Sequence, residues 1–343
     1  MEKLLTVKDV AGYLQMSKEK VYKLAQKGKI PVSRIENQWR FRLDKINVWL
    51  EANEISSISV IPQSISLQLP IKAKPFLKWA GGKGQLLRQY EPLFPDKFNS
   101  YLEPFVGGGV VFFHLFSTGR LDNGKRIILI DSNEELINCY EVIKENVESL
   151  ISILSGPKFV NKKDVYYKIR SEEPKDKVER AARTIYLNKT CFNGLYRVNS
   201  RGKFNVPFGG YKNPLICNKE NLRAVSRTLQ YVNIKLDDFT VCLNFARKDD
   251  FIYFDPPYQP LSQTASFTGY TKDLFREADQ ERLLDVFRKL GKKGCKVMIS
   301  NSDTKFVRKL YKGYRIETVF AKRAINCKPS GRGKITELVI LNY

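Results

Sequence analysis

From residue 74 onward, apolar runs typical of buried strands alternate with helical patterns, and this alternation constrains the fold more than any other feature of the sequence. The first unit, SYLEPFV, passes through GGG into the helical segment VVFFHLFSTG, and the second, RIILID, leads into SNEELINCYEVIKENVESLISIL. Two further strand-like runs, DDFIYFD and CKVMISN, follow later. Strands that alternate with helices usually pair in parallel. We therefore predict an α/β fold with a doubly wound, mostly parallel sheet.

A long stretch, residues 151–235, interrupts this alternation between its second and third units. It contains a helical pattern, VERAARTIYLNKT, and the segment VNSRGKFNV, in which a glycine-containing turn between two strand-like pieces predicts a hairpin. We expect residues 74–150 and 236–343 to form one domain around the parallel sheet. Residues 151–235 would then be an inserted, mostly helical domain.

Residues 1–53 have the pattern of a separate small domain. Thr6, with an acid three residues later, and Ser17 are placed to cap two short helices, and Gly28 would end the second. The tight connection QMS between the helices is typical of a helix-turn-helix, and the strand-like pieces SRI and QWRFRL follow as a wing before a last helix. Residues 54–73 alternate Ser with Ile and carry two prolines, so we expect a linker there.

Over its full length, the stretch LLTVKDVAGYLQMSKEKVYKLAQKGKIPVSRIENQWRFRLDKINVWL resembles the excisionase and MerR-type winged helix-turn-helix family. The resemblance implies that the second helix enters the major groove of DNA while the wing touches the backbone. The basic residues that would make these contacts are Lys18, Lys20, Lys23 and Lys27 on the helix, and Arg34, Arg40 and Arg42 on the wing. Helix and wing carry the same sign of charge, as a phosphate-facing surface requires.

The overall charge also points to an anionic partner. The chain carries 59 Lys and Arg against 36 Asp and Glu, a formal net charge of +23. Such an excess presents positive potential over much of the surface, and nucleic acid is the partner that it most favours. Composition alone leaves a basic but otherwise ordinary enzyme as the alternative.

The cysteines and the single histidine argue against metal and histidine chemistry. The six Cys residues are scattered without a C-x-x-C pair, so neither a zinc site nor a disulfide framework is indicated. His114 lies in the apolar segment VVFFHLF, where a hydrogen-bonded structural role is expected. We therefore expect no metal, and a mechanism with His as general base is disfavoured.

The N-terminal residues, MEKLLTVKDV, lack the basic end and apolar run of a signal peptide. No segment approaches the apolar span of about twenty residues that crosses a membrane. We expect a protein of the cytosol without membrane association.

The segment EPFVGGG predicts a cofactor site. The chain leaves a strand and turns from Gly107 to Gly109 into a helix, which allows a ligand to approach the backbone closely. Asp131 ends the next strand, where an acid can accept hydrogen bonds from both ribose hydroxyls. These residues leave NAD and S-adenosylmethionine both open. A P-loop is disfavoured, because Leu77 and Gly84 occupy two positions that its motif gives to other residue types.

The stretch FIYFDPPYQP joins a strand-like run to an acid, two prolines and a tyrosine. Proline fixes its own φ and has no N–H for a sheet, so the strand must end there. This cluster suits a reaction in which the exocyclic amine of a base attacks an electrophilic methyl group. The Asp255 carboxylate and the Pro256 carbonyl would each accept one N–H and align the nitrogen. Pro256 and Pro257 would hold that carbonyl in place, and Tyr258 would stack on the base.

An amine inside a duplex cannot reach this cluster, so the base would be flipped out, and the insert would hold the DNA and fill the gap. Other methyltransferase types can be weighed against this prediction. Methylation at cytosine C5 needs a nucleophilic cysteine after a proline, and no proline here precedes a cysteine. Cytosine N4 enzymes usually carry Ser at the position of Asp255. RNA adenine, guanine and glutamine methyltransferases share related tetrads, so the motif alone leaves them open.

From about residue 74 to the C-terminus, eight segments follow in a fixed order: PFLKWAGGKGQLL, YLEPFVGGG, LIDSN, NKTCFNGLYRVNSRGKFNVPFGGYKNP, DDF, FDPPYQP, FREADQERLLDVF and GRGKITELVILNY. In this order they resemble the Dam family of DNA adenine-N6 methyltransferases. The resemblance implies a Rossmann-like catalytic domain that uses S-adenosylmethionine, with an inserted target-recognition domain. It also implies that the substrate is the adenine of GATC in double-stranded DNA.

The same resemblance assigns roles to the residues at matching positions. Cofactor binding would fall to Trp79, Lys83, Phe105, Gly107, Gly109, Asp131, Asp238, Phe239 and Asp255. Contact with the target DNA would fall to Lys78, Phe192, Asn193, Leu195, Arg197 and Pro207. Phe192 would wedge into the duplex, and Asn193 would assist at the vacated site. The outer bases would be read by Leu195, Arg197 and Pro207. Arginine suits guanine because it can bond O6 and N7 of the base together.

Two features depart from the family pattern. Gly210 stands where many members carry Arg, so a basic DNA contact would be lost at the edge of the site, and the leading winged domain is unusual. The alternatives are a DNA-binding regulator that keeps an inactive or cofactor-sensing catalytic fold, and an RNA adenine methyltransferase. A cognate restriction endonuclease is a candidate partner, and we expect a monomer.

Overall fold

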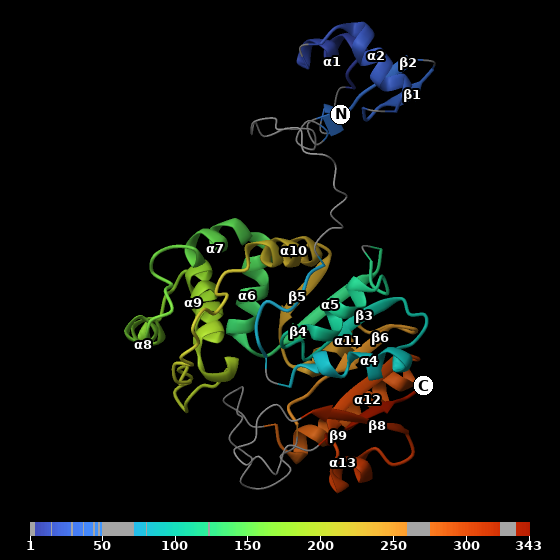
Figure 1. The fold of residues 1–343 in the computed structure, drawn as a ribbon. Helices are drawn as coiled ribbons and strands as arrows, with labels where there is room; N and C mark the ends of the chain where they lie inside the picture. Colours follow the sequence, from blue (N-terminus) through green and yellow to red (C-terminus); the bar gives the residue numbers. More distant parts are fainter. Residues whose placement is uncertain are drawn as a thin grey trace. The chain divides into compact units, whose positions relative to one another are not determined.

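The computed structural model describes residues 4–49 except 15, 29, 37, 44, 47 and 48, then 72–258 except 80 and 123, then 275–322 and 334–343. The chain divides into two compact units, Met1–Leu67 and Gln68–Tyr343 (Figure 1). The predicted linker, 54–73, lies outside the described residues except for its last two.

The smaller unit has the helices and wing expected of a winged helix-turn-helix. Its elements are α1 (Val7–Tyr13), α2 (Lys18–Gln26), β1 (Ser33–Ile35) and β2 (Gln38–Arg40). Thr6 forms a complete capping box with Asp9, and the Ser17 side chain accepts a hydrogen bond from the backbone of Lys20, which confirms both predicted caps. Gly28 follows α2 with φ of 62°, a conformation that favours glycine. The predicted last helix lies largely outside the described residues.

The larger unit is built on a seven-stranded sheet in the order β5-β4-β3-β6-β7-β9-β8. The strands are β3 (Ser100–Glu103), β4 (Arg126–Asp131), β5 (Val232–Leu236), β6 (Phe251–Phe254), β7 (Lys296–Ser302), β8 (Arg315–Lys322) and β9 (Lys334–Leu341). The neighbouring strands β5, β4, β3, β6 and β7 are parallel to one another. Strand β9 lies between β7 and β8 and is antiparallel to both. The predicted α/β fold with a mostly parallel sheet is confirmed.

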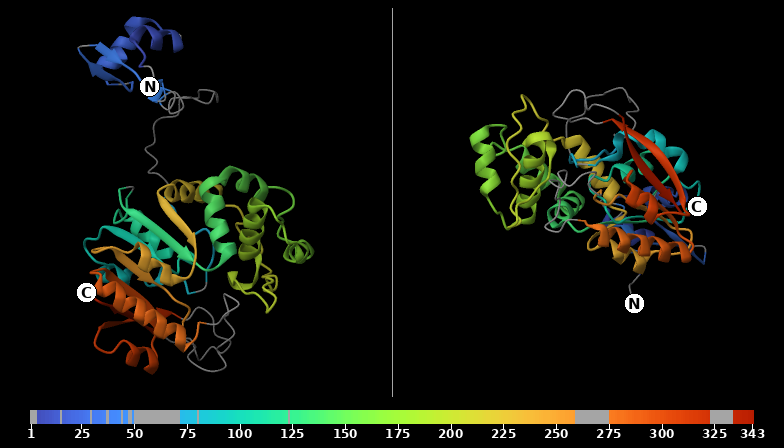
Figure 2. Two further views of the ribbon diagram at one scale, coloured as in Figure 1. Left: turned by 180° about the vertical axis from the view of Figure 1, so that it is seen from behind. Right: turned by 90° about the horizontal axis from the view of Figure 1, so that it is seen from below.

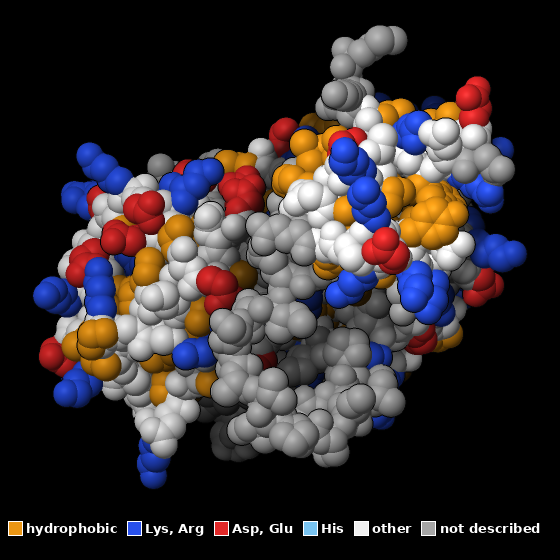
Figure 3. All heavy atoms as spheres, turned by 90° about the horizontal axis from the view of Figure 1, so that it is seen from above, with side chains coloured by type: hydrophobic (Ala, Val, Ile, Leu, Met, Phe, Trp, Pro, Cys, Tyr) orange, Lys and Arg blue, Asp and Glu red, His pale blue; other side chains and the backbone are white. Residues whose placement is uncertain are grey.

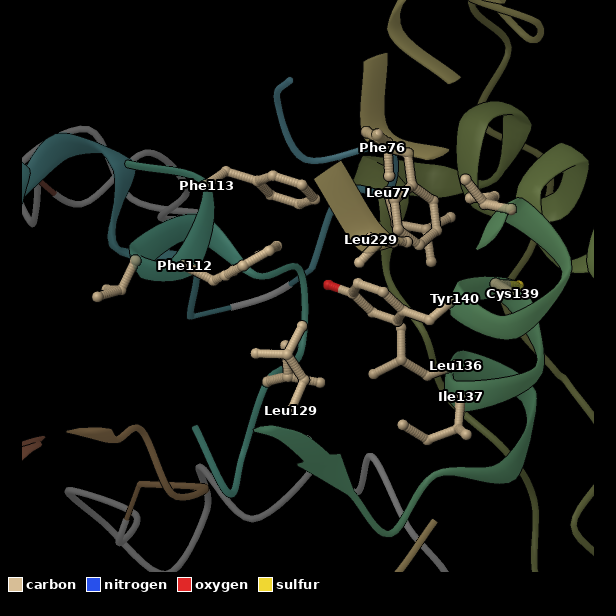
Figure 4. Packing of buried hydrophobic residues seen from close by; sticks show 14 of the residues in the cluster. Phe76, Leu77, Phe112, Phe113, Leu129, Leu136, Ile137, Cys139, Tyr140 and Leu229 are labelled. Carbon is tan, nitrogen blue, oxygen red and sulfur yellow. The ribbon is translucent and has the colours of Figure 1, made fainter. Parts of the chain in front are cut away.

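Helices cover both faces of this sheet, because its strands are apolar on both sides. In β4, Ile127 and Leu129 point into one hydrophobic cluster, whereas Ile128 and Ile130 point into the other. The helices on the first face are α5 (Val110–Ser117), α6 (Glu134–Glu145), α7 (Val147–Leu154), α9 (Lys177–Thr190) and α10 (Lys219–Leu229); those on the second are α11 (Cys242–Phe245), α12 (Glu277–Lys292) and α13 (Lys305–Leu310). Figures 1 and 2 show this two-sided arrangement, and Figure 4 shows Tyr140 of α6 packed in the first cluster.

The segment between β4 and β5 shares its core with the sheet. It contains α8 (Lys163–Ser171), the predicted helix α9, and the predicted hairpin, in which Val198 pairs with Phe204. Tyr166 of α8 and Tyr186 of α9 belong to the same hydrophobic cluster as the strands. Residues 232–235, which the sequence assigned to the insert, form most of β5 instead.

Two further features qualify the sequence predictions. The helical pattern after β4 is two helices, because Asn146 between them has φ of −133° and ψ of 37°. His114 on α5 lies 2.5 Å from the carboxylate of Glu91, in keeping with the expected hydrogen-bonded role.

Within the described part of the chain, no helix is long and apolar enough to cross a membrane. In Figure 3, Lys and Arg side chains of the described residues are interspersed with acidic and hydrophobic ones.

Candidate active site

The glycine turn after β3 has a backbone that other residues would strain. Gly107 and Gly109 have φ of 48° and 67°. A Cβ added at Gly107 would lie 2.8 Å from the ring of Trp79, and one added at Gly109 would lie 2.6 Å from the hydroxyl of Tyr140. That hydroxyl donates to the Gly107 carbonyl over 3.0 Å. The turn is therefore held closely by two aromatic side chains, and glycine is required at both positions.

Asp131 braces this turn from the end of β4. Its carboxylate accepts hydrogen bonds from the backbone N–H groups of Gly107 and Asn133, each over 3.0 Å. Burial raises the pKa of Asp131 to about 6, although these hydrogen bonds act in the opposite direction. A carboxylate oxygen can accept more than one hydrogen bond, so Asp131 keeps acceptor capacity toward the cavity that it lines.

A cluster of aromatic rings with an acid beside it lies past the end of β5. The rings of Phe105 and Phe239 stack with centroids 5.2 Å apart, and Phe275 meets Phe105 edge-on at 5.7 Å. The Arg282 guanidinium lies 5.1 Å from the Phe239 centroid and 3.1 Å from a carboxylate oxygen of Asp238. An aromatic surface with an oxygen acceptor at its edge suits a purine ring that carries an exocyclic amine.

Asp255, the first residue after β6, is held by side chains from distant parts of the chain. Its Oδ1 atom accepts a hydrogen bond from Ser300 of β7 over 2.7 Å and lies 2.8 Å from Nζ of the buried Lys83. Lys83 also donates to the Gly81 carbonyl, and its Nζ lies 4.5 Å from the ring centroid of Tyr258. Lys83, predicted as a cofactor residue, thus contacts two members of the D-P-P-Y motif.

Tyr258 is anchored at its hydroxyl by Glu337 of β9, whose Oε2 accepts a hydrogen bond over 2.5 Å. Burial, together with the negative charge of Asp255, raises the pKa of Tyr258 well above its ordinary value. The hydroxyl therefore stays protonated and acts as a donor at neutral pH.

All of the predicted cofactor and catalytic residues line one cavity of about 1310 Å³. They are Trp79, Lys83, Phe105, Gly107, Gly109, Asp131, Asp238, Phe239, Asp255, Pro256, Pro257 and Tyr258. Sites for one small ligand usually measure about 300–1,000 Å³, so the space suits a cofactor together with a second group. The structure places these residues together, and their individual roles stay predictions.

Several lining residues were missed from the sequence. Tyr196 stacks on Trp79 with centroids 5.2 Å apart, and Glu103 is a buried acid in β3 that accepts a hydrogen bond from Tyr101 over 2.7 Å. Burial raises the pKa of Glu103 well above its ordinary value. An acid inside an apolar strand, just before a glycine turn, was a signal that could have identified Glu103. Nothing local in the sequence marked Tyr196.

The predicted DNA-contacting residues of the larger unit lie outside the lining of this cavity, at or near the short 3₁₀ helix η3 (Phe192–Gly194). The buried Asn188 side chain accepts from the backbone N–H of Lys78 over 2.8 Å and donates to the carbonyls of Lys78 and Gly194. Asn193 has φ of 56° and donates its N–H to the hydroxyl of Tyr211, over whose ring Lys78 Nζ lies at 4.9 Å. Lys78 and η3 are therefore held against each other.

Phe192 projects from η3 with 49% of its surface exposed. Its backbone N–H donates to the Pro207 carbonyl over 2.9 Å, and its carbonyl accepts from Leu195 over 3.2 Å, so both residues lie close to it. Arg197 is half-buried, and its Nε donates to the side chain of Asn205 over 2.7 Å. The guanidinium would have to share or leave this contact to reach a base.

In the smaller unit, Lys18, Lys20 and Lys23 are exposed on α2, as a DNA-facing helix requires. Arg40 is only half-exposed, and its guanidinium donates to the Trp39 carbonyl over 3.1 Å and to the side chain of Gln38.

The strand order with one antiparallel strand, the glycine turn after β3 and the D-P-P-Y motif after β6 together define a Rossmann-like methyltransferase. More specifically, the chain belongs to the D12 class N6 adenine-specific DNA methyltransferases, whose family model matches residues 79–325. A helix-turn-helix domain model matches residues 4–54. The predicted resemblance to DNA adenine-N6 methyltransferases, the predicted helix-turn-helix and the predicted class of reaction are thereby confirmed.

Individual relatives agree with this assignment. Type II methyltransferase M.MjaIII of Methanocaldococcus jannaschii is 47% identical over 292 residues, which cover 80% of this chain and 100% of that protein. Type II methyltransferase M1.LlaDCHI of Lactococcus lactis subsp. cremoris is 44% identical, covering 80% and 96%. A DNA adenine methylase of Haemophilus influenzae is 40% identical, covering 82% and 97%.

Proposed function

We propose that this enzyme transfers a methyl group from S-adenosylmethionine to N6 of the adenine in GATC within double-stranded DNA. The observation that carries the proposal is the single cavity that joins the D-P-P-Y motif to the glycine turn and Asp131. A site for the nucleoside part of a cofactor and an acceptor pair for an amine thus open into one space.

The residues of the cavity fit S-adenosylmethionine. The aromatic cluster of Phe105, Phe239 and Phe275 would pack against the adenine ring, with Asp238 accepting from its amine, and Asp131 would accept from the ribose hydroxyls. Bound there, the cofactor would supply an electrophilic methyl group on a sulfonium.

Asp255 would orient the target amine. Lys83 and Ser300 both contact Oδ1, so we assign Oδ2 to one N–H of the adenine and the Pro256 carbonyl to the other. These two acceptors would align the nitrogen lone pair with the methyl carbon and stabilise the positive charge that forms on the amine. As the N–C bond forms, the bond between the methyl carbon and the sulfur would break and leave a neutral thioether, and the amine would then lose its proton to solvent, so no histidine base is needed.

The DNA-facing residues would deliver the base. We propose that Phe192, exposed on η3, enters the duplex as the adenine leaves it, while Lys78, Asn193, Leu195, Arg197 and Pro207 contact the site around it. The exposed lysines of α2 would give the smaller unit a separate grip on DNA. We expect the enzyme to act as a monomer, because it modifies one strand of the duplex at a time.

Transfer of a labelled methyl group from S-adenosylmethionine tests this function. A duplex that contains GATC should be labelled, and a matched duplex with GTTC in its place should not. Asp255→Ala should abolish transfer while leaving DNA binding largely intact. Retained DNA binding without transfer to either duplex would instead favour a regulator with an inactive catalytic fold.

A further inference from the structure

Glu337 lies far along the sequence from the D-P-P-Y motif, yet in the folded protein it contacts the tyrosine of that motif. Its Oε2 accepts the hydroxyl proton of Tyr258 over 2.5 Å, across 79 positions of the sequence. We propose that Glu337 is a positioning residue that fixes the ring of Tyr258 against the flipped adenine. This inference rests on the proposed function.

The ring of Tyr258 needs such an anchor because its backbone lies outside any helix or strand. Lys83 Nζ lies over one face of the ring, 4.5 Å from its centroid, so the opposite face is the one on which a base can stack. The contact with Lys83 lies over the face of the ring, whereas the hydrogen bond to Glu337 fixes the position of the hydroxyl. Stacking needs parallel planes, so this restraint prepares the ring before the base arrives.

Glu337 is itself rigid, because it belongs to β9 in the interior of the sheet. It pairs with Ser302 of β7 on one side and with Val319 of β8 on the other. A carboxylate also suits the task chemically. A hydrogen bond from a phenol to an ionised acceptor is short and strong, and it draws negative charge toward the ring. An electron-rich ring favours the positive charge that forms on the adenine during the attack.

A purely structural role for Glu337 makes a different prediction. If the carboxylate only accepted a hydrogen bond from a buried hydroxyl, its loss would lower the stability of the protein. It would have no specific effect on the rate of methyl transfer from the bound cofactor. The two roles can be separated with four variants: Glu337→Leu, Glu337→Gln, Tyr258→Phe and the double variant Glu337→Leu/Tyr258→Phe. Glu317→Leu is a matched control, because Glu317 lies on the adjacent strand β8 and pairs with Arg315.

The measurement is the single-turnover rate of methyl transfer to a GATC duplex by the full chain, with the dissociation constant for S-adenosylmethionine and the Tm as companion values. Glu337→Leu should slow transfer about tenfold with little change in cofactor affinity, since a hydrogen bond to a charged group is lost. Glu337→Gln keeps an acceptor oxygen but loses the charge, so it should restore part of the rate. Tyr258→Phe should slow transfer by a similar factor, and the double variant should be no slower than Tyr258→Phe.

The inference is overturned if Glu337→Leu transfers at the wild-type rate, or if it slows the Tyr258→Phe enzyme as much as it slows the wild type. Glu317→Leu should keep the wild-type rate, and a loss as large as that of Glu337→Leu would also count against the inference. Failure of the wild-type enzyme to methylate GATC would contradict the proposed function instead.

Discussion

Gly109→Ala should destabilise the larger unit in two separable ways. The first is backbone strain, because φ at this position is 67° and an L-residue there costs about 1–2 kcal/mol relative to glycine. The second is steric. The new Cβ would lie 2.6 Å from the Tyr140 hydroxyl and would push it off the Gly107 carbonyl, leaving a buried hydroxyl unpaired at a cost of about 1–3 kcal/mol. The total loss in the free energy of unfolding is about 2–5 kcal/mol.

Gly119→Ala provides the matched control for this prediction. Gly119 has φ of 75°, and none of the described atoms lies within 4 Å of an added Cβ, so only the backbone cost applies. In a unit of this size, about 1 kcal/mol corresponds to roughly 2–4 °C in Tm. Thermal unfolding should therefore show Gly109→Ala melting several degrees below Gly119→Ala. Equal Tm values for the two variants would refute the steric part of the reasoning.

Three further outcomes follow from the site. Ser300→Ala removes a 2.7 Å hydrogen bond to Asp255 but leaves the Lys83 contact, so the methyl-transfer rate should fall about tenfold while DNA affinity in a gel-shift assay stays unchanged. Burial raises the pKa of Asp131 to about 6, and its ionised form is the better acceptor for ribose hydroxyls. Cofactor affinity, followed by fluorescence titration, should therefore rise between about pH 5 and pH 7, and this rise should disappear in Asp131→Asn. An unchanged pH profile in that variant would assign the titration to another group. Phe192→Ala should slow transfer to a normal duplex more than transfer to a duplex with a mispaired target adenine, because a mispaired base costs less to flip; equal slowing would contradict a wedge role.

Much of the site was predictable because its parts are local. The turn through Gly107 and Gly109, the acid at the end of β4 and the D-P-P-Y motif after β6 each lie within a few residues of a strand end. In a parallel sheet those ends share one edge, so a prediction of strands already implied that the three motifs would meet. The caps at Thr6 and Ser17 were predictable for the same reason, since each contacts a backbone group three residues away.

Only the tertiary structure decided which side chains hold the site residues in place. Ser300 reaches Asp255 across 45 positions, and Asn188 holds Lys78 across 110. The order of the strands brings Ser300 next to Asp255, because β7 lies next to β6, whereas Asn188 reaches Lys78 from helix α9. A hydrogen bond between distant residues leaves no periodic pattern in either segment. The sequence by itself therefore determined which chemical groups the protein would use, and the packing of the sheet decided which side chains hold them in place.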